Sequence, residues 1–230
     1  MKKYAWILFD VDDTLFHFDA FLGLKTMFRT FGVDFSEQDY QHYLPYNKGL
    51  WNQYQNGQIS VDELKQQRFQ HWAKKLNTST LVLEAAFQES MYHICTPFDG
   101  ADSLLNCLKG RSKLGIITNG FVQMQKIRLS NAGLLQHFDI LVTSEEVGVA
   151  KPNPGIFEHT FAKIGLPCRD EILMVGDNLD ADILGGIGVG IDTCWLNPKN
   201  IAAPAGISPS YQVSSLFELE CLLMRAFELR

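Results

Sequence analysis

The chain has 230 residues, a net charge of −6 and a pI near 5.5, and 46% of its residues are hydrophobic. This length suits one large α/β domain or a core domain that carries a smaller inserted one, packed as a soluble globule. The acidic balance argues against a protein that binds nucleic-acid polymers, and no apolar stretch is long enough to span a membrane.

The cysteines are few and scattered, and they form no cluster with histidine. They are Cys95, Cys107, Cys168, Cys194 and Cys221. We therefore expect reduced thiols, a cytoplasmic protein and no zinc site. The apolar run near the amino terminus stops at Asp10, which is too early for a signal peptide.

Short apolar runs alternate with helix-length segments along most of the chain. The runs span residues 4–9, 114–117, 138–142, 172–175 and 191–196. The helical segments span residues 100–109, 122–131, 155–164 and 181–187, and a last amphipathic pattern covers 214–229. Strands that alternate with helices predict an α/β fold with a doubly wound parallel sheet, whose ligands bind at the carboxyl ends of the strands.

Residues 16–96 break this alternation. They contain no convincing buried strand but show four helical patterns, at 19–31, 36–56, 60–76 and 80–94. Ser36 and Ser60 each precede an acidic residue by three positions, which is typical of a helix amino terminus. We interpret this block as an all-helical domain inserted after the first strand, with the core domain made of residues 1–15 and 97–230.

The strongest chemical signal follows the first strand, where Asp10, Asp12 and Asp13 precede Thr14. Three carboxylates in four residues repel one another, so the arrangement is unfavourable without a cation or a chemical task. If Asp10 and Asp12 face one crevice, one can attack phosphorus while the other donates a proton to the leaving oxygen. The alternative, a solvated turn, is disfavoured because a buried strand leads directly into the cluster.

Three further features follow later predicted strands. Thr118 and Asn119 offer a hydroxyl and a turn of backbone N–H groups that can bind phosphate, although Asn-Gly is also an ordinary turn sequence. Lys151 is either a site residue or a surface lysine. Asp177 and Asp182 are either ligands for a hard cation, for which oxygen donors favour Mg²⁺, or the acidic start of a helix.

Together, these motifs resemble the four signature motifs of the haloacid dehalogenase-like superfamily, in its phosphatase branch. They read DVDDT at 10–14, IITN at 116–119, AKP at 150–152 and GDNLDAD at 176–182. The resemblance implies a Rossmann-like catalytic core and a helical cap domain at 16–96. A looser likeness to bacterial pyrimidine 5′-nucleotidases includes the stretches at 46–48, 50–51, 144–152 and 182–187.

The resemblance implies a role for each motif residue. Asp10 is expected to be the nucleophile and Asp12 the acid and base. Thr118 and the backbone of Asn119 are expected to hold phosphate, with Lys151 neutralising charge on the nucleophile and the phosphoryl oxygens.

The same resemblance implies a Mg²⁺ site, with Mn²⁺ as a substitute. The expected ligands are the carboxylates of Asp10 and Asp177 and the main-chain carbonyl of Asp12. Asp182 is expected to position Lys151 or a metal-bound water. On the cap side, the candidates for substrate contact are Asn47, Lys48 and Trp51.

The resemblance thus implies a phosphoric monoester hydrolase that acts on nucleoside 5′-monophosphates, such as UMP, dUMP or dTMP, through an aspartyl-phosphate intermediate. The partner is a small nucleotide, and monomer and homodimer both stay open.

One alternative is a sugar-phosphate phosphatase or phosphomutase with the same core chemistry. A haloacid dehalogenase is disfavoured because displacing halide needs no proton donor at Asp12. A phospho-aspartate receiver module is disfavoured because receivers are much shorter and carry their acidic residues on different strands.

Overall fold

The computed structural model describes residues 1–228 and separates into two compact units. The core unit contains Met1–His17 and the chain from Thr96 onward, and the helical unit contains Phe18–Cys95. Within residues 1–228, no helix combines the length and the hydropathy needed to cross a membrane.

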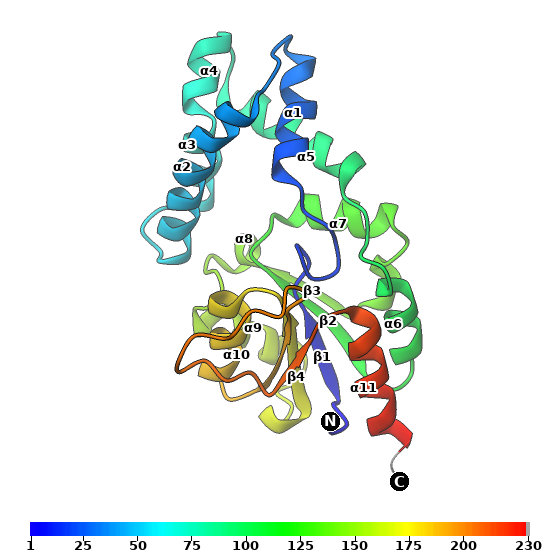
Figure 1. The fold of residues 1–230 in the computed structure, drawn as a ribbon. Coiled ribbons are helices and arrows are strands. Elements are labelled where there is room, and N and C mark those ends of the chain that lie inside the picture. Colours follow the sequence, from blue (N-terminus) through cyan, green and yellow to red (C-terminus); the bar gives the residue numbers. More distant parts are fainter. Residues whose placement is uncertain (229–230) are drawn as a thin grey trace. The chain divides into compact units, whose positions relative to one another are not determined.

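The core unit is built on a parallel sheet of six strands in the order β3-β2-β1-β4-β5-β6 (Figure 1). The strands are β1 (Trp6–Phe9), β2 (Lys113–Thr118), β3 (Ile140–Thr143), β4 (Ile172–Gly176), β5 (Asp192–Leu196) and β6 (Tyr211–Val213). Leu8 of β1 lies opposite Gly115 of β2 and Met174 of β4, so β1 is the central strand between two neighbours. This topology confirms the predicted doubly wound α/β fold; the three-residue β6 was not anticipated.

Helices cover both faces of this sheet. They are α6 (Ala101–Leu108), α7 (Val122–Asn131), α8 (Ser144–Val147), α9 (Pro154–Lys163), α10 (Gly185–Gly188) and α11 (Leu216–Glu228). Figure 1 shows α9 and α10 on one side of the sheet and α6 and α11 on the other. Phe157 and Phe161 of α9 pack on Leu8 and Met174, which is the burial expected for a central parallel strand. The predicted helical end Leu229 lies outside the described residues.

The helical unit contains α1 (Ala20–Thr30), α2 (Glu37–Gln55), α3 (Val61–Arg68), α4 (Gln70–Leu76) and α5 (Thr80–Ile94). Ser36 and Ser60 form capping boxes, as predicted. The prediction of one helix over 60–76 is wrong, because the chain bends at Phe69 between α3 and α4. The ring of Phe69 is completely buried beside those of Tyr43 and Phe87, so tertiary packing fixes the bend.

A buried ion pair joins α3 to α5 in this unit. Arg68 donates from Nε and Nη2 to the two carboxylate oxygens of Glu84, both at 2.6 Å, and both side chains are about 5% exposed or less. Gln88 adds a hydrogen bond to Glu84 at 2.7 Å. Removing one charge from such a pair leaves the other buried without compensation.

We therefore expect Glu84→Gln to lower the free energy of unfolding by about 3 kcal/mol, measured by urea denaturation. The control is Glu89→Gln on the same helix, because Glu89 pairs with His93 at the surface, where the side chains are 66% and 72% exposed. That substitution should change stability by less than about 0.5 kcal/mol. Equal losses in the two variants would contradict the importance of the buried pair.

Candidate active site

Three neighbouring strands deliver polar residues to one edge of the sheet. Asp10 directly follows β1, Thr118 is the last residue of β2, and Asp177 directly follows β4. The backbone N–H of Asp10 donates to the carbonyl of Val175 at 2.9 Å, which extends the pairing of β1 with β4 by one residue. Because the strands are parallel, these residues meet at their carboxyl ends, as the sequence predicted.

The turn after β1 is tied to the Asp177 strand end by Thr14. Its hydroxyl donates to Asp177 Oδ1 at 3.2 Å and accepts from the backbone N–H of Asp177 at 3.1 Å. Asp13 adopts a left-handed conformation with φ of 58°, and the N–H groups of Leu15 and Phe16 close the turn on the carbonyl of Val11. The sequence pattern gave no indication of this linking role of Thr14.

Lys151 is a buried residue of this site, so the surface-lysine alternative is wrong. Its ammonium group donates to Asp10 Oδ1 at 2.7 Å, to Asp182 Oδ1 at 2.5 Å and to the carbonyl of Ile117 at 2.7 Å. Burial alone would lower the pKa of Lys151, but the two carboxylates raise it above its ordinary value. Lys151 is therefore a fixed positive charge against Asp10.

Asn119 fixes the backbone from which Lys151 extends. Its side chain donates to the carbonyl of Lys151 at 2.9 Å and accepts from the N–H of Lys151 at 2.8 Å. Ser144, in turn, donates to the carbonyl of Asn119 at 3.0 Å. The side chain of Asn119 thus connects the loop after β2 to the loop that carries Lys151, while its predicted backbone contact with phosphate stays a prediction.

Asp182 is buried and reaches Lys151 from the turn after β4. Its other oxygen accepts from the backbone N–H of Asn178 at 3.1 Å. A side chain at Gly176 would place its Cβ only 2.2 Å from this carboxylate, so glycine makes the close approach possible. The side chain of Asn178 caps the following turn by accepting from the backbone N–H groups of Asp180 and Ala181, both at 3.0 Å.

Asp10, Asp177 and Asp182 form a cluster of carboxylates that suits a cation. One oxygen from each lies within 4.8 Å of the others. Burial raises the pKa of Asp10 to about 7, with Asp182 and Asp12 adding to the effect and Lys151 opposing it. Burial likewise raises the pKa of Asp177 to about 8, together with the charges of Asp10 and Asp182. Oxygen donors in such a site fit a hard divalent cation, so the acidic-helix alternative does not account for these residues.

Asp12 lies at the same edge but has other partners. Arg128 of α7 donates to its Oδ1, and Gln125 donates to its Oδ2 at 3.1 Å. Neither Gln125 nor Arg128 was predicted from the sequence. The available signal was weak: two polar residues three positions apart on a helix whose neighbours Met124 and Leu129 are core residues.

The cap-side candidates Asn47, Lys48 and Trp51 all lie on α2 of the helical unit. Asn47 Oδ1 is buried and has no hydrogen-bond partner among residues 1–228, Lys48 is exposed, and the ring of Trp51 lies 5.9 Å from that of Tyr54. Their contact with substrate stays a prediction.

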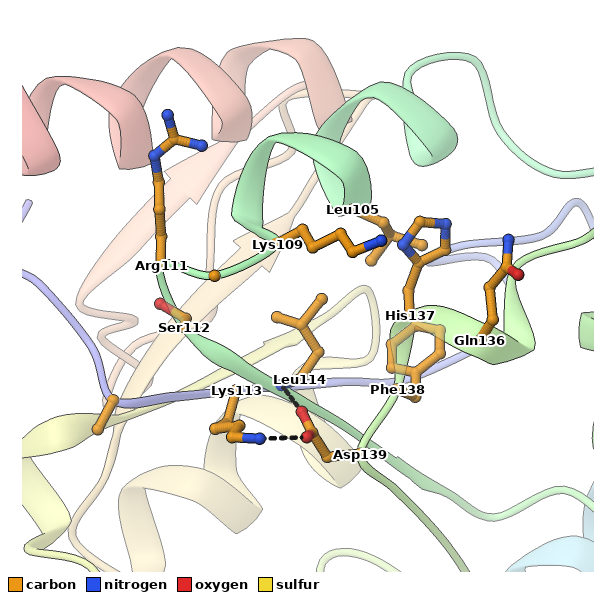
Figure 2. A pocket seen from close by; sticks show the side chains of 12 residues that line it. Leu105, Lys109, Arg111, Ser112, Lys113, Leu114, Gln136, His137, Phe138 and Asp139 are labelled. Carbon is orange, nitrogen blue, oxygen red and sulfur yellow. Dashed lines mark hydrogen bonds and ion pairs between the residues drawn. The ribbon is translucent and has the colours of Figure 1, made fainter.

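A hollow of about 450 Å³ lies at the other end of the sheet (Figure 2). Lys109, Lys113 and His137 line it, near the beginnings of β2 and β3. Its acidic residue Asp139 is occupied by an ion pair with Lys113 at 2.6 Å. This hollow holds none of the clustered carboxylates and is separate from the candidate active site.

Known proteins share both this fold and this length. The model of the haloacid dehalogenase-like hydrolase family matches residues 4–190. The chain belongs to this family, which confirms the resemblance. It is 51% identical to the pyrimidine 5′-nucleotidase YjjG of Escherichia coli over 97% of this chain and 99% of that protein. It is 33% identical to the pyrimidine 5′-nucleotidase PynA of Streptococcus pneumoniae, over 95% of each chain.

A solved structure gives a further comparison within the family. The HAD-hydrolase YfnB of Bacillus subtilis, determined bound to magnesium, is 33% identical and superposes with a TM-score of 0.86, over 97% of this chain and 100% of that one. The membership makes this chain a hydrolase with the shared sheet topology.

The raised pKa values give a prediction about cation binding. Because Asp10 and Asp177 titrate near pH 7 and 8 when no cation is present, protons compete with Mg²⁺ below that range. We expect Mg²⁺ to bind more tightly at about pH 9 than at about pH 6, with protons released on binding, measured by titration calorimetry in buffers of different ionisation enthalpy.

Asp177→Asn should weaken binding at both pH values. The control Asp180→Asn, which changes an exposed acid in the same turn, should leave binding unchanged. An affinity that does not vary between the two pH values would contradict the site.

Proposed function

We propose that the chain is a Mg²⁺-dependent phosphatase that hydrolyses nucleoside 5′-monophosphates, preferably those with a pyrimidine base. The observation that carries the chemistry is the placement of Asp10, buried between the ammonium of Lys151 and the carboxylate of Asp177 at the carboxyl end of the central strand. The substrate class rests on the likeness to two pyrimidine 5′-nucleotidases along almost the entire chain.

In the first half-reaction, a carboxylate oxygen of Asp10 attacks phosphorus and the bond from phosphorus to the ester oxygen breaks. Thr118 and the backbone of Asn119 hold the phosphoryl oxygens, and Lys151 offsets the repulsion between the carboxylate and the phosphate. Asp12 donates a proton to the leaving nucleoside oxygen. Positioning and electrostatic stabilisation are the main contributions that a protein makes to such a transfer.

In the second half-reaction, water attacks the aspartyl phosphate. Asp12, now a carboxylate, takes the proton from this water, and the bond between phosphorus and the Asp10 oxygen breaks. Inorganic phosphate leaves, and both aspartates return to their starting states. One residue thus serves as acid and then as base.

The carboxylates of Asp10 and Asp177 and the main-chain carbonyl of Asp12 would hold Mg²⁺, with Asp182 keeping Lys151 in place. When bound, the cation neutralises charge on the phosphoryl group. The fit rests on the oxygen-only donor set and on the raised pKa values of Asp10 and Asp177, which reflect burial and uncompensated negative charge.

The test of the substrate class is a panel of phosphate esters assayed with Mg²⁺ and with EDTA. We expect phosphate release to be fastest with UMP, dUMP or dTMP, slower with purine nucleotides and sugar phosphates, and lost in EDTA. Preference for a sugar phosphate would overturn the nucleotidase assignment while leaving the phosphatase chemistry intact, and full activity in EDTA would remove the role of the cation.

Two substitutions separate the roles of the aspartates. Asp10→Asn should abolish turnover of every ester, because the nucleophile is lost. Asp12→Asn should slow turnover of UMP by about 100-fold or more, but slow the first step with p-nitrophenyl phosphate much less, because p-nitrophenolate leaves without a proton. Single-turnover release of uridine and of p-nitrophenolate measures the first step with each ester, and unchanged hydrolysis of UMP by Asp12→Asn would contradict the acid role.

A further inference from the structure

Arg128 is a buried cation that the family motifs do not include. It lies on α7 with a side chain that is 0% exposed, and its guanidinium carbon lies 5.5 Å from the centre of the Phe16 ring. From Nη2 it donates both to Asp12 Oδ1 and to Gln125 Oε1. A guanidinium keeps its charge in proteins, and burying it is costly unless it is paired, so Asp12 is its charge partner here.

Gln125 holds the other oxygen of the same carboxylate. Its side chain is fully buried, and Nε2 donates to Asp12 Oδ2 at 3.1 Å while lying 3.5 Å from the hydroxyl of Thr118. The space that this amide occupies is created by Gly120, where an added Cβ would come within 2.0 Å of Nε2. Glycine at 120 therefore allows Gln125 to reach Asp12.

Asp10 and Asp12, the first and third residues of the DVDDT motif, pair with different cations. Lys151 pairs with Asp10 and Asp182, whereas Arg128 pairs with Asp12. The side chain of Asp12 is still 27% exposed, so part of its carboxylate stays accessible to solvent although Arg128 and Gln125 bind both oxygens. Two anchors on two oxygens fix the rotation of the carboxylate about its side-chain bonds.

We propose that Arg128 and Gln125 are positioning residues for Asp12, which set where its carboxylate meets the ester oxygen of the substrate. This inference rests on the proposed function, in which Asp12 exchanges a proton with that oxygen. It implies that α7 determines how well the enzyme cleaves esters of weakly acidic alcohols, such as the 5′-hydroxyl of a nucleoside.

The test compares UMP with p-nitrophenyl phosphate in Arg128→Lys and Gln125→Met. Gln125→Met keeps the ion pair between Arg128 and Asp12, so this variant still tests the positioning role if Arg128→Lys does not fold. We expect the single-turnover rate constant of the first step to fall at least about 10-fold more with UMP than with p-nitrophenyl phosphate, with little change in KM. Arg169→Lys, at an arginine that stacks on Phe161 and pairs with Glu158, is the matched control and should leave both substrates unaffected.

A second measurement separates positioning from loss of structure. In the Asp12→Asn background, Arg128→Lys should slow UMP hydrolysis by no more than about 2-fold further, because a residue that acts through Asp12 has nothing left to position. Equal losses on both substrates, or losses that multiply in the double variant, would overturn the proposal.

The proposed function and the positioning role can fail separately. If the unchanged chain releases phosphate from neither ester, the proposed function fails and the positioning role fails with it. If the unchanged chain hydrolyses both esters but the ratio between them is the same in the variants, the positioning role alone is wrong.

Discussion

The buried ammonium group of Lys151 is the interaction on which the arrangement of the site depends. Its three donors reach Asp10, Asp182 and the carbonyl of Ile117, so the cation is fully hydrogen-bonded although it is removed from water. Removing a cation from water is costly, and two carboxylates at 2.5–2.7 Å offset that cost. Asn119 hydrogen-bonds both the N–H and the carbonyl of Lys151, so the loop after β2 is joined to the loop that precedes α9 and carries the ammonium group.

Negative charge nevertheless exceeds positive charge at this edge of the sheet. Among residues 1–228, the connected groups at this edge include two cations, Lys151 and Arg128. They also include four carboxylates, those of Asp10, Asp12, Asp177 and Asp182, which leaves a formal excess of two negative charges. Such an excess in a buried place raises carboxylate pKa values, and a divalent cation would cancel it. The charge balance thus favours a site that is complete only with a cation.

The sequence was sufficient for what depends on local pattern. Apolar runs predicted the buried strands, and carboxylates placed after them predicted one acidic edge, because parallel strands end together. It was insufficient where a side chain's partner is set by tertiary packing. Arg128 finds Asp12 across 116 residues, and Phe69 interrupts a helical pattern because its ring fills the core of the helical unit. Asn178 caps the turn after β4 because its backbone is extended, which no spacing rule specifies.

The segment from Thr118 to Arg128 carries both the proposed phosphate contact and the residues that bind the carboxylate of Asp12. It begins with the hydroxyl assigned to phosphate, passes through Gly120, and continues into α7 with Gln125 and Arg128 on the carboxylate of Asp12. A shift of this segment would move the phosphate contact and the proton donor together. Asp10 is held independently, by Lys151 and by the pairing of β1 with β4. In the proposed mechanism, the nucleophile is thus held by the central strand and the acid by the segment assigned to the phosphate, which would keep the donor aligned with the bond that breaks.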